Sequence, residues 1–285
     1  MKILVFSPGY LGNKMVDALR AHGHDVATVR VEITDLAAVS AALDEHHPEA
    51  VLNCAGQKGT PNVDWCEAHQ IETMRSNTIG PLILAQACGE RGIHFTHLGS
   101  GCVFYGPSPD PKGWREDDYA NPSAMYTRSK YAADLILTRL PNVAIVRLRM
   151  PIDDVPNPGN LIDKLASFSK IIDVENSVTV VEDLLQVIVG VIEKKGTGVF
   201  HALNDGVMRH RDLIALYEEL VDPAHTNEWI SHDQLMTLGL VAKTRSNCIL
   251  QNTRLPALGI TMRPIQVALR DCMEKYAKAV KSAAK

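Results

Sequence analysis

Short apolar runs alternate with helical patterns along the first 150 residues. The apolar run at 3–6 leads into a Pro8–Gly9 turn, and apolar side chains then recur with helical spacing from about 11 to 21. The same alternation predicts further strands at 25–31, 50–54, 93–98 and 143–149, and further helices at 35–45, 78–90 and 124–139. Strands that alternate with helices predict a parallel sheet covered on both faces. We therefore expect an α/β, doubly wound, Rossmann-like fold.

The pattern changes after residue 150. Three prolines, at 151, 156 and 158, interrupt the chain before a predicted helix that begins at Asn160. A helix at 182–194 and a strand at 198–202 can return to the main sheet. We expect a dinucleotide-binding domain made of 1–150 with 176–202, and a smaller helical substrate-binding lobe made of 151–175 with 203–285. Such a lobe above the strand ends would form a cleft where ligands of these sheets bind.

The first turn is typical of a nucleotide site. Its sequence is Phe6-Ser-Pro-Gly9-Tyr10-Leu11-Gly12, a partial GxxGxxG pattern whose first position we assign to Phe6. Backbone amides from Gly9 to Gly12 could approach a pyrophosphate at the start of the helix. Plain packing of the strand against the helix is the alternative for the turn taken alone.

Two residues near the end of the second predicted strand bear on the choice of cofactor. Arg30 could pair with a 2′-phosphate, whereas Glu32, about twenty residues past the glycines, could bind a free 2′-hydroxyl. We expect both side chains on one strand face, so they compete as explanations. The prediction is NADP(H) in preference to NAD(H), and a solvated ion pair at the strand end is the alternative for either residue.

Tyr126 and Lys130 lie four residues apart in a predicted helix. This spacing places both side chains on one face, where the ammonium could lower the pKa of the phenol and hold a cofactor ribose. The phenol would then serve as a proton donor in hydride transfer. Tyr10 and Lys14 show the same spacing, but they lie where the nucleotide turn enters its first helix. The context therefore favours Tyr126 as the acid.

Composition narrows the function further. Lys and Arg number 29 against 33 Asp and Glu, which gives a net charge of −4 without a long basic block, so nucleic acid is not an expected partner. No apolar stretch approaches the length of a membrane span or a secretory signal, and we expect a cytoplasmic protein. The cysteines at 54, 66, 88, 102, 248 and 272 lack the spacing of a zinc site or a disulfide framework, and we expect no metal.

Several motifs occur in an order that resembles the extended short-chain dehydrogenase/reductase family. They are the glycine turn, Asn53-Cys-Ala55-Gly56, Asn77, Ser100 and the Tyr126/Lys130 pair. More narrowly, the chain is similar to nucleotide-sugar reductases that finish rhamnose synthesis, and most to plant-type bifunctional 3,5-epimerase/4-reductases. The runs that carry this narrower likeness are Pro61-Asn-Val-Asp-Trp-Cys-Glu67, Gly101-Cys102, Arg147-Leu-Arg-Met-Pro-Ile152 and Arg245-Ser-Asn247.

The resemblance implies a substrate and a set of roles. The substrate would be a nucleoside-diphosphate 4-keto-6-deoxyglucose. Tyr126 would donate a proton to the C4 oxygen, Lys130 would hold the ribose, and Ser100 would bond the carbonyl. Ala55, Gly56 and Asn77 would belong to the cofactor site, with a helix cap as the alternative for Asn77.

The likeness also implies residues for epimerisation and for the diphosphate. Cys102 and Lys164 would move protons at C3 and C5, and Asn160 and Arg245 would hold the diphosphate. Two other functions stay open at this point: a reductase that depends on a separate epimerase, and a non-catalytic regulatory subunit, which Phe6 in the glycine motif favours. We expect a homodimer by analogy with other proteins of this fold.

Overall fold

A six-stranded parallel sheet forms the centre of the computed structural model, which describes residues 1–283. Its strand order is β10-β5-β4-β3-β1-β2. The strands are β1 (Lys2–Phe6), β2 (Asp25–Val29), β3 (Ala50–Asn53), β4 (His94–Ser100), β5 (Val143–Leu148) and β10 (Gly198–His201). Every neighbouring pair in this sheet is parallel. Each strand has a counterpart among the predicted ones.

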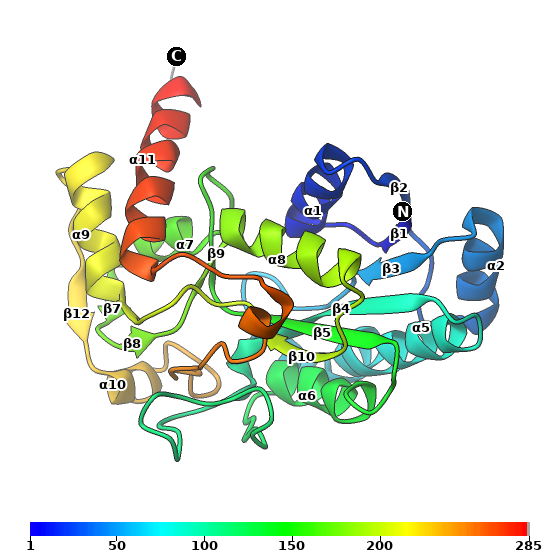
Figure 1. Ribbon diagram of the computed structural model, residues 1–285. Coiled ribbons are helices and arrows are strands. Elements are labelled where there is room, and N and C mark those ends of the chain that lie inside the picture. The colour runs from blue at the N-terminus through cyan, green and yellow to red at the C-terminus, as the bar shows by residue number, and fades with distance from the viewer. Residues whose placement is uncertain (284–285) are drawn as a thin grey trace.

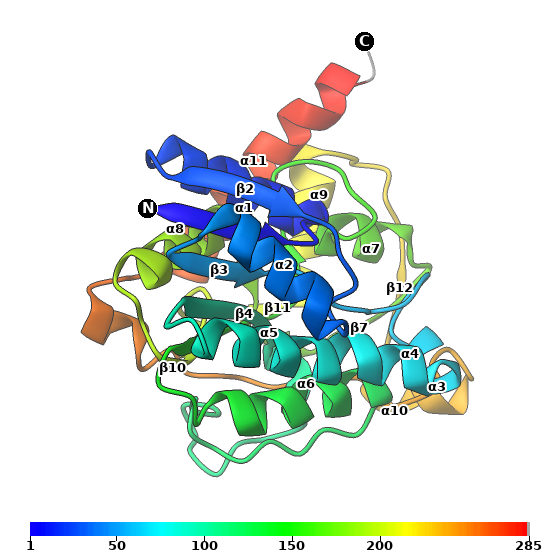
Figure 2. The same ribbon diagram turned by 90° about the vertical axis from the view of Figure 1, so that its right-hand side faces the viewer.

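Helices cover both faces of the sheet (Figures 1 and 2). On one face lie α1 (Tyr10–Ala21) and α8 (Val181–Glu193), whose apolar side chains share a core with β1, β3 and β5. On the other lie α2 (Leu36–His46), α5 (Gly80–Gly89) and α6 (Met125–Leu137), which form a second core. This arrangement confirms the predicted doubly wound α/β fold.

The connection from β3 to α5 is more elaborate than the predicted single helix at 78–90. It contains α3 (Trp65–Ala68), α4 (Gln70–Met74) and a π-helical turn, η1 (Arg75–Ile79), that runs directly into α5. After β4, a short 3₁₀ turn, η2 (Gly101–Val103), begins the long loop to α6. Phe104 and Trp114 anchor that loop by stacking in a small apolar cluster with Leu250.

The segments that the sequence assigns to a helical lobe contain α7 (Leu161–Ser167), α9 (His210–Leu220), α10 (His232–Thr237) and α11 (Ile265–Ala283), with a 3₁₀ turn, η3 (Leu255–Leu258), beside the main sheet. Side chains of α7, α9 and α11 share one core, to the left in Figure 1. Three short strand pairs that the pattern did not predict join these segments: β6 (Pro151–Ile152) with β9 (Thr179–Val180), β7 (Lys170–Ile172) with β12 (Glu228–Ile230), and β8 (Glu175–Asn176) with β11 (Met208–Arg209). The division of the chain into two domains stays a prediction, and its last two residues lie outside the described range.

The sheet reverses its winding between β1 and β3. The chain leaves β1 for β2 on one side and then returns to β3 on the other side. At such a switch point the connections leave in opposite directions, so a crevice opens beyond the carboxyl ends of the strands. The residues that follow β1, β3 and β4 therefore converge on one place.

The first position of the glycine motif, Phe6, lies at the end of a buried strand. Phe6 is the last residue of β1, fully buried, and pairs with Val29 and Asn53. Ser7 begins the turn instead, with a φ of 48°. This is the left-handed region that glycine adopts without strain. The first motif position therefore holds a phenylalanine whose side chain enters the core, and the chain turns at the next residue, Ser7.

Substitutions at Ser7 test this conformation. Ser7→Val should lower the free energy of unfolding by about 1–2 kcal/mol, because a β-branched side chain is strained at positive φ. Ser7→Gly should stay within about 1 kcal/mol of the parent, since relief of strain offsets the added freedom of the unfolded chain. Urea unfolding of both variants checks the prediction, and equal stabilities would contradict it.

Candidate active site

The turn after β1 provides a cradle at the switch point. A methyl group added at Gly9 would meet no atom within 4 Å, whereas one added at Gly12 would lie 3.1 Å from Cys54 and from Pro8. Gly12 therefore lets α1 approach the end of β3 closely, and Gly9 leaves open space beside the helix start. The first amides of α1 have no partner within their own helix, so this end can receive an anion.

Arg30 and Glu32 do not share a strand face, which corrects the sequence expectation. β2 ends at Val29, so both lie in the following loop. The Arg30 guanidinium donates to the Pro8 carbonyl at 2.5 Å, at the beginning of the glycine turn. The Glu32 carboxylate accepts bonds from the Thr34 hydroxyl at 2.6 Å and from its amide at 3.0 Å, which lower the pKa of Glu32. Of the two side chains, Arg30 is the one held against the turn.

Lys130 is buried on α6 beneath the candidate cofactor site. It is 4% exposed, and its ammonium donates to the Leu98 carbonyl of β4 at 3.0 Å. A methyl group added at Gly56 would lie 3.2 Å from the same nitrogen, so the glycine admits the lysine to this position. Burial lowers the pKa of Lys130 to about 8, although Asp134 and Cys54 act in the opposite direction. Lys130 thus lies beside Gly56, in the segment after β3, and also bonds to β4.

The pKa of Tyr126 is not lowered by Lys130, and this sequence expectation was wrong. Burial raises the pKa of the phenol well above its usual value, and the nearby Cys102 adds to the rise. A hydrogen bond with the Ser100 side chain opposes the shift. The Tyr126 phenol is therefore protonated at neutral pH, and the group that bonds to it is Ser100.

Ser100 joins the phenol to the turn that carries Cys102. Its hydroxyl oxygen also accepts a bond from the Cys102 amide at 3.2 Å and so caps η2. Cys102 in turn lies within electrostatic reach of both Tyr126 and Lys164. The end of β4 therefore gathers Ser100, Cys102 and Tyr126 around one point.

Lys164 approaches that point from the lobe. It lies on α7 and is partly buried, and its pKa is lowered by burial and by the neighbouring Lys58, whereas Cys102 raises it. The structure thus brings together the two residues that the resemblance assigns to epimerisation. A lysine with a lowered pKa exchanges protons more readily near neutral pH than an exposed lysine does.

Asn77 holds the segment after β3. Its side chain donates to the Gln57 carbonyl at 2.8 Å and to the Ser129 hydroxyl at 3.1 Å, and it accepts from the Gln57 amide at 2.8 Å. It lies within the π-helical turn η1 and does not cap a helix. Asn77 therefore links the segment after β3, which contains Ala55 and Gly56, to α6.

The two residues predicted to hold a diphosphate have other partners in the structure. Asn160 is fully buried and caps α7 by accepting from the Ile162 amide, while its remaining hydrogen bonds go to Asp153 and Val155. Arg245 forms a two-pronged ion pair with Asp64, at 2.7 and 2.8 Å. A direct role of either residue in binding a diphosphate stays a prediction.

Three acidic residues that sequence reasoning missed support the site. Glu67 accepts a bond from the Met125 amide at 2.7 Å and so caps α6 from a distant segment. Asp134 pairs with Arg147 at 2.8 Å in the protein interior. Asp153 lies beside Tyr10 and Lys14. Only Asp134 left a signal in the sequence, because it follows Lys130 at the same four-residue spacing.

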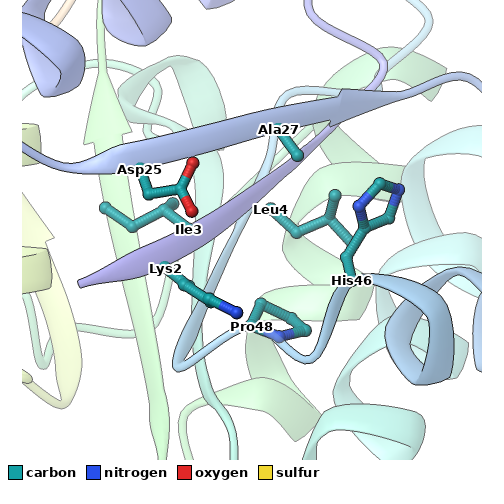
Figure 3. A pocket seen from close by; sticks show the side chains of 7 residues that line it. All are labelled: Lys2, Ile3, Leu4, Asp25, Ala27, His46 and Pro48. Atoms are coloured by element: carbon teal, nitrogen blue, oxygen red, sulfur yellow. The ribbon is translucent and has the colours of Figure 1, made fainter.

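The cavity in Figure 3 is separate from this site. It measures about 150 Å³ and lies between the first residues of β1 and β2, beside Lys2, Asp25 and His46. That edge is opposite the one where the strands end. Within residues 1–283, no group of three or more His, Cys, Asp or Glu side chains is arranged to hold a metal, and no helix is long and apolar enough to cross a membrane.

Comparison with known proteins decides the family. A family model described as the RmlD substrate binding domain matches residues 1–278. The chain belongs to the RmlD substrate binding domain family. The match includes the glycine turn, α6 and α7, so every candidate residue of the site lies within the part that characterises the family.

One relative of this chain is a bifunctional enzyme. A dTDP-4-dehydrorhamnose 3,5-epimerase/dTDP-4-dehydrorhamnose reductase of Arabidopsis thaliana is 32% identical over 274 residues, covering 94% of this chain and 89% of that protein. A trifunctional UDP-glucose 4,6-dehydratase/3,5-epimerase/reductase of the same plant is 28% identical, and the chain spans 42% of its length.

Solved structures share the fold of this RmlD-family chain closely. A UDP-rhamnose synthase from Acanthamoeba polyphaga mimivirus superposes with a TM-score of 0.90 at 30% identity, covering 96% of this chain and 99% of that one. A dTDP-4-dehydrorhamnose reductase from Bacillus anthracis in complex with NADP gives a TM-score of 0.81 at 20% identity, covering 96% of each chain. The second likeness concerns the fold alone.

Proposed function

We propose that this protein uses NAD(P)H to reduce the 4-keto group of a nucleoside-diphosphate 4-keto-6-deoxy sugar, after inverting its C3 and C5 centres, and so yields a rhamnose nucleotide. The observation that carries the proposal is the convergence of Tyr126, Ser100 and Cys102 from the main domain with Lys164 from α7. The names of the Arabidopsis and mimivirus relatives support the same substrate class.

The residues at the switch point fit a dinucleotide. Gly9 leaves room beside the amides that begin α1, and Gly12 and Gly56 permit close approach of the surrounding segments. Arg30 lies against this turn, with donors beyond the one bonded to Pro8, and would pair with a 2′-phosphate. The Glu32 carboxylate is engaged by Thr34. We therefore propose NADP(H) in preference to NAD(H).

Tyr126 would complete the reduction by protonating the C4 oxygen. A bound reduced nicotinamide supplies the hydride. Because burial keeps the phenol protonated, Tyr126 has a proton to give when negative charge grows on the ketone oxygen. Ser100 bonds to the phenol and would orient it toward that oxygen, while Lys130 would hold a ribose hydroxyl from below.

Cys102 and Lys164 would perform the epimerisation. The keto group acidifies the protons at C3 and C5, and inversion removes a proton from one face of the ring and returns one to the other face. Cys102 approaches from η2 and Lys164 from α7, which belong to different parts of the fold. The lowered pKa of Lys164 suits proton exchange, and Lys58 beside it contributes to that lowering.

The regulatory alternative rests on Phe6, which stands where the motif has its first glycine and leaves less room for a tight turn. Phe6 instead ends β1 in the core, and Ser7 takes the positive φ that the turn requires. The position of the Phe6 side chain in the core is compatible with an open nucleotide turn, which supports the catalytic proposal.

Tyr126→Phe tests the reduction. The variant should bind NADPH normally but lose about 10²–10⁴-fold in reduction rate, because it lacks the proposed proton donor to the C4 oxygen. The matched control is Tyr131→Phe on the same helix, whose hydroxyl accepts from the Ala120 amide away from the site. Both are assayed with dehydratase product and NADPH. Full reduction by Tyr126→Phe, or no turnover by the parent protein, would contradict the proposal.

Solvent deuterium tests the epimerisation. In D₂O the parent protein should place deuterium at C3 and C5 of the product, read by mass spectrometry and NMR. Cys102→Ala and Lys164→Ala should each reduce that incorporation at least about tenfold, because each removes one of the two proton carriers. Lys170→Ala, an exposed lysine just past α7, is the control. Reduction without deuterium in the parent would identify a reductase that depends on a separate epimerase.

A further inference from the structure

The second Tyr–Lys pair of the chain has partners of its own. Tyr10 and Lys14 lie on one face of α1, and both reach Asp153, the residue that follows β6. The Tyr10 hydroxyl donates to the Asp153 carboxylate, and the Lys14 ammonium lies 3.0 Å from the same oxygen. Lys14 also lies 3.4 Å from Asp154. The proposed reaction uses neither the Lys14 ammonium nor the Asp153 carboxylate.

Asp153 is fastened on its other side to α7. Its amide donates to the Asn160 side chain at 3.1 Å, and its carbonyl accepts from the same side chain at 2.9 Å. Asn160 in turn caps α7 through the Ile162 amide at 3.2 Å. One turn later, the Lys164 amide donates to the Asn160 carbonyl, also at 3.2 Å. Asp153, Asn160 and the start of α7 are therefore one hydrogen-bonded unit that carries Lys164.

Tyr10 contributes to both ends of this connection. It is the first residue of α1, so its backbone belongs to the turn that cradles a pyrophosphate. Its phenol meanwhile holds Asp153, which is only 3% exposed. Hydrogen bonds to a carboxylate that is shielded from water are strong and directional. The Tyr10 side chain is therefore a direct contact between the turn and Asp153.

We propose that Asp153 is a positioning residue that couples the dinucleotide turn to α7, through Tyr10 and Lys14 on one side and Asn160 on the other. Binding of NADPH at the turn fixes Tyr10, and the contact with Asp153 then orders the start of α7. The final step, placement of Lys164 for proton transfer, rests on the proposed function. The coupling itself does not, because it concerns the order of α7 alone.

Hydrogen–deuterium exchange of the full-length protein measures the coupling directly. NADPH should slow exchange of the 161–167 amides about fivefold or more in the parent, which is within the usual range of coupling between sites. Tyr10→Phe and Asp153→Asn preserve the shape of each side chain but remove the hydroxyl donor or the carboxylate charge. In both variants the NADPH-dependent slowing at 161–167 should largely disappear while NADPH still slows exchange in the glycine turn.

A double variant and a control make the result specific. Tyr10→Phe with Asp153→Asn should behave like either single variant, because both changes break the same contact. Arg270→Ala removes an ion pair between α11 and Glu219 of α9, inside the lobe, and should leave the coupling intact. Thermal unfolding of each variant confirms that it folds. Parent-like slowing at 161–167 in Asp153→Asn, or no slowing there in the parent, would overturn the proposal.

A catalytic measurement separates this proposal from the proposed function. NADP⁺, which cannot donate hydride, should accelerate deuterium incorporation at C3 and C5 in the parent but not in Asp153→Asn, where reduction by NADPH should fall less than incorporation does. A merely structural defect would lower both activities together, which would contradict a positioning role. If exchange at 161–167 responds to NADPH as expected and the parent shows no turnover, the coupling stands and the proposed function fails.

Discussion

Burial of charge on one face of α6 is the constraint on which the site depends. Lys130 and Asp134 lie one turn apart on that face, and both are almost removed from water. A buried ammonium or carboxylate is costly unless each has partners. Lys130 donates to the Leu98 carbonyl of β4, and Asp134 pairs with Arg147 of β5. These contacts fix the rotation and height of α6 against the sheet, which in turn places Tyr126 beside Ser100.

The same burial decides the chemistry of the acid. A lysine close to a phenol lowers its pKa only where the electrostatic attraction exceeds the cost of removing the phenolate from water. In this protein the cost of desolvation is larger, and the hydrogen bond from the Ser100 side chain compensates only part of it. The Tyr126 phenol therefore keeps its proton at neutral pH, as the proposed role in reduction requires. Burial lowers the pKa of Lys130 to about 8, so of these two side chains Lys130 is the one that titrates nearer to neutral pH.

The site also depends on segments that close over the strand ends. α7 supplies Lys164, and its position follows from Asn160 and Asp153, which connect it to the beginning of α1. Glu67 caps α6 from the opposite side, although α6 has no capping side chain of its own at Ala124. The segment Pro61–Glu67 thus has a structural role, because Glu67 helps to position α6. Its Asp64 in turn holds Arg245.

The sequence predicted what local periodicity determines and missed what distant contacts determine. Alternating apolar runs located the six main strands and α6, because each element buries a continuous face. The positive φ at Ser7 was missed because the motif describes the spacing of glycines and does not record the backbone conformation of the residues between them. The short strand pairs of the lobe and the cap from Glu67 were missed because they join segments far apart in the chain, and no local pattern records such pairing. Tyr10 and Lys14 were set aside because they lie where the nucleotide turn enters its first helix, and no local pattern shows that Asp153, more than a hundred residues away, is their partner.

The pH dependence of reduction tests the central claim that burial, rather than the neighbouring ammonium, sets the protonation of Tyr126. Single-turnover reduction by NADPH is followed from about pH 6 to about pH 10. Reduction requires a protonated phenol, and burial raises the pKa of that phenol, so the rate should stay level through neutrality. It should fall only as Lys130 loses its proton, with an apparent pKa of about 8. A rate that already falls between about pH 6 and about pH 7 would show an acidified phenol and contradict the account.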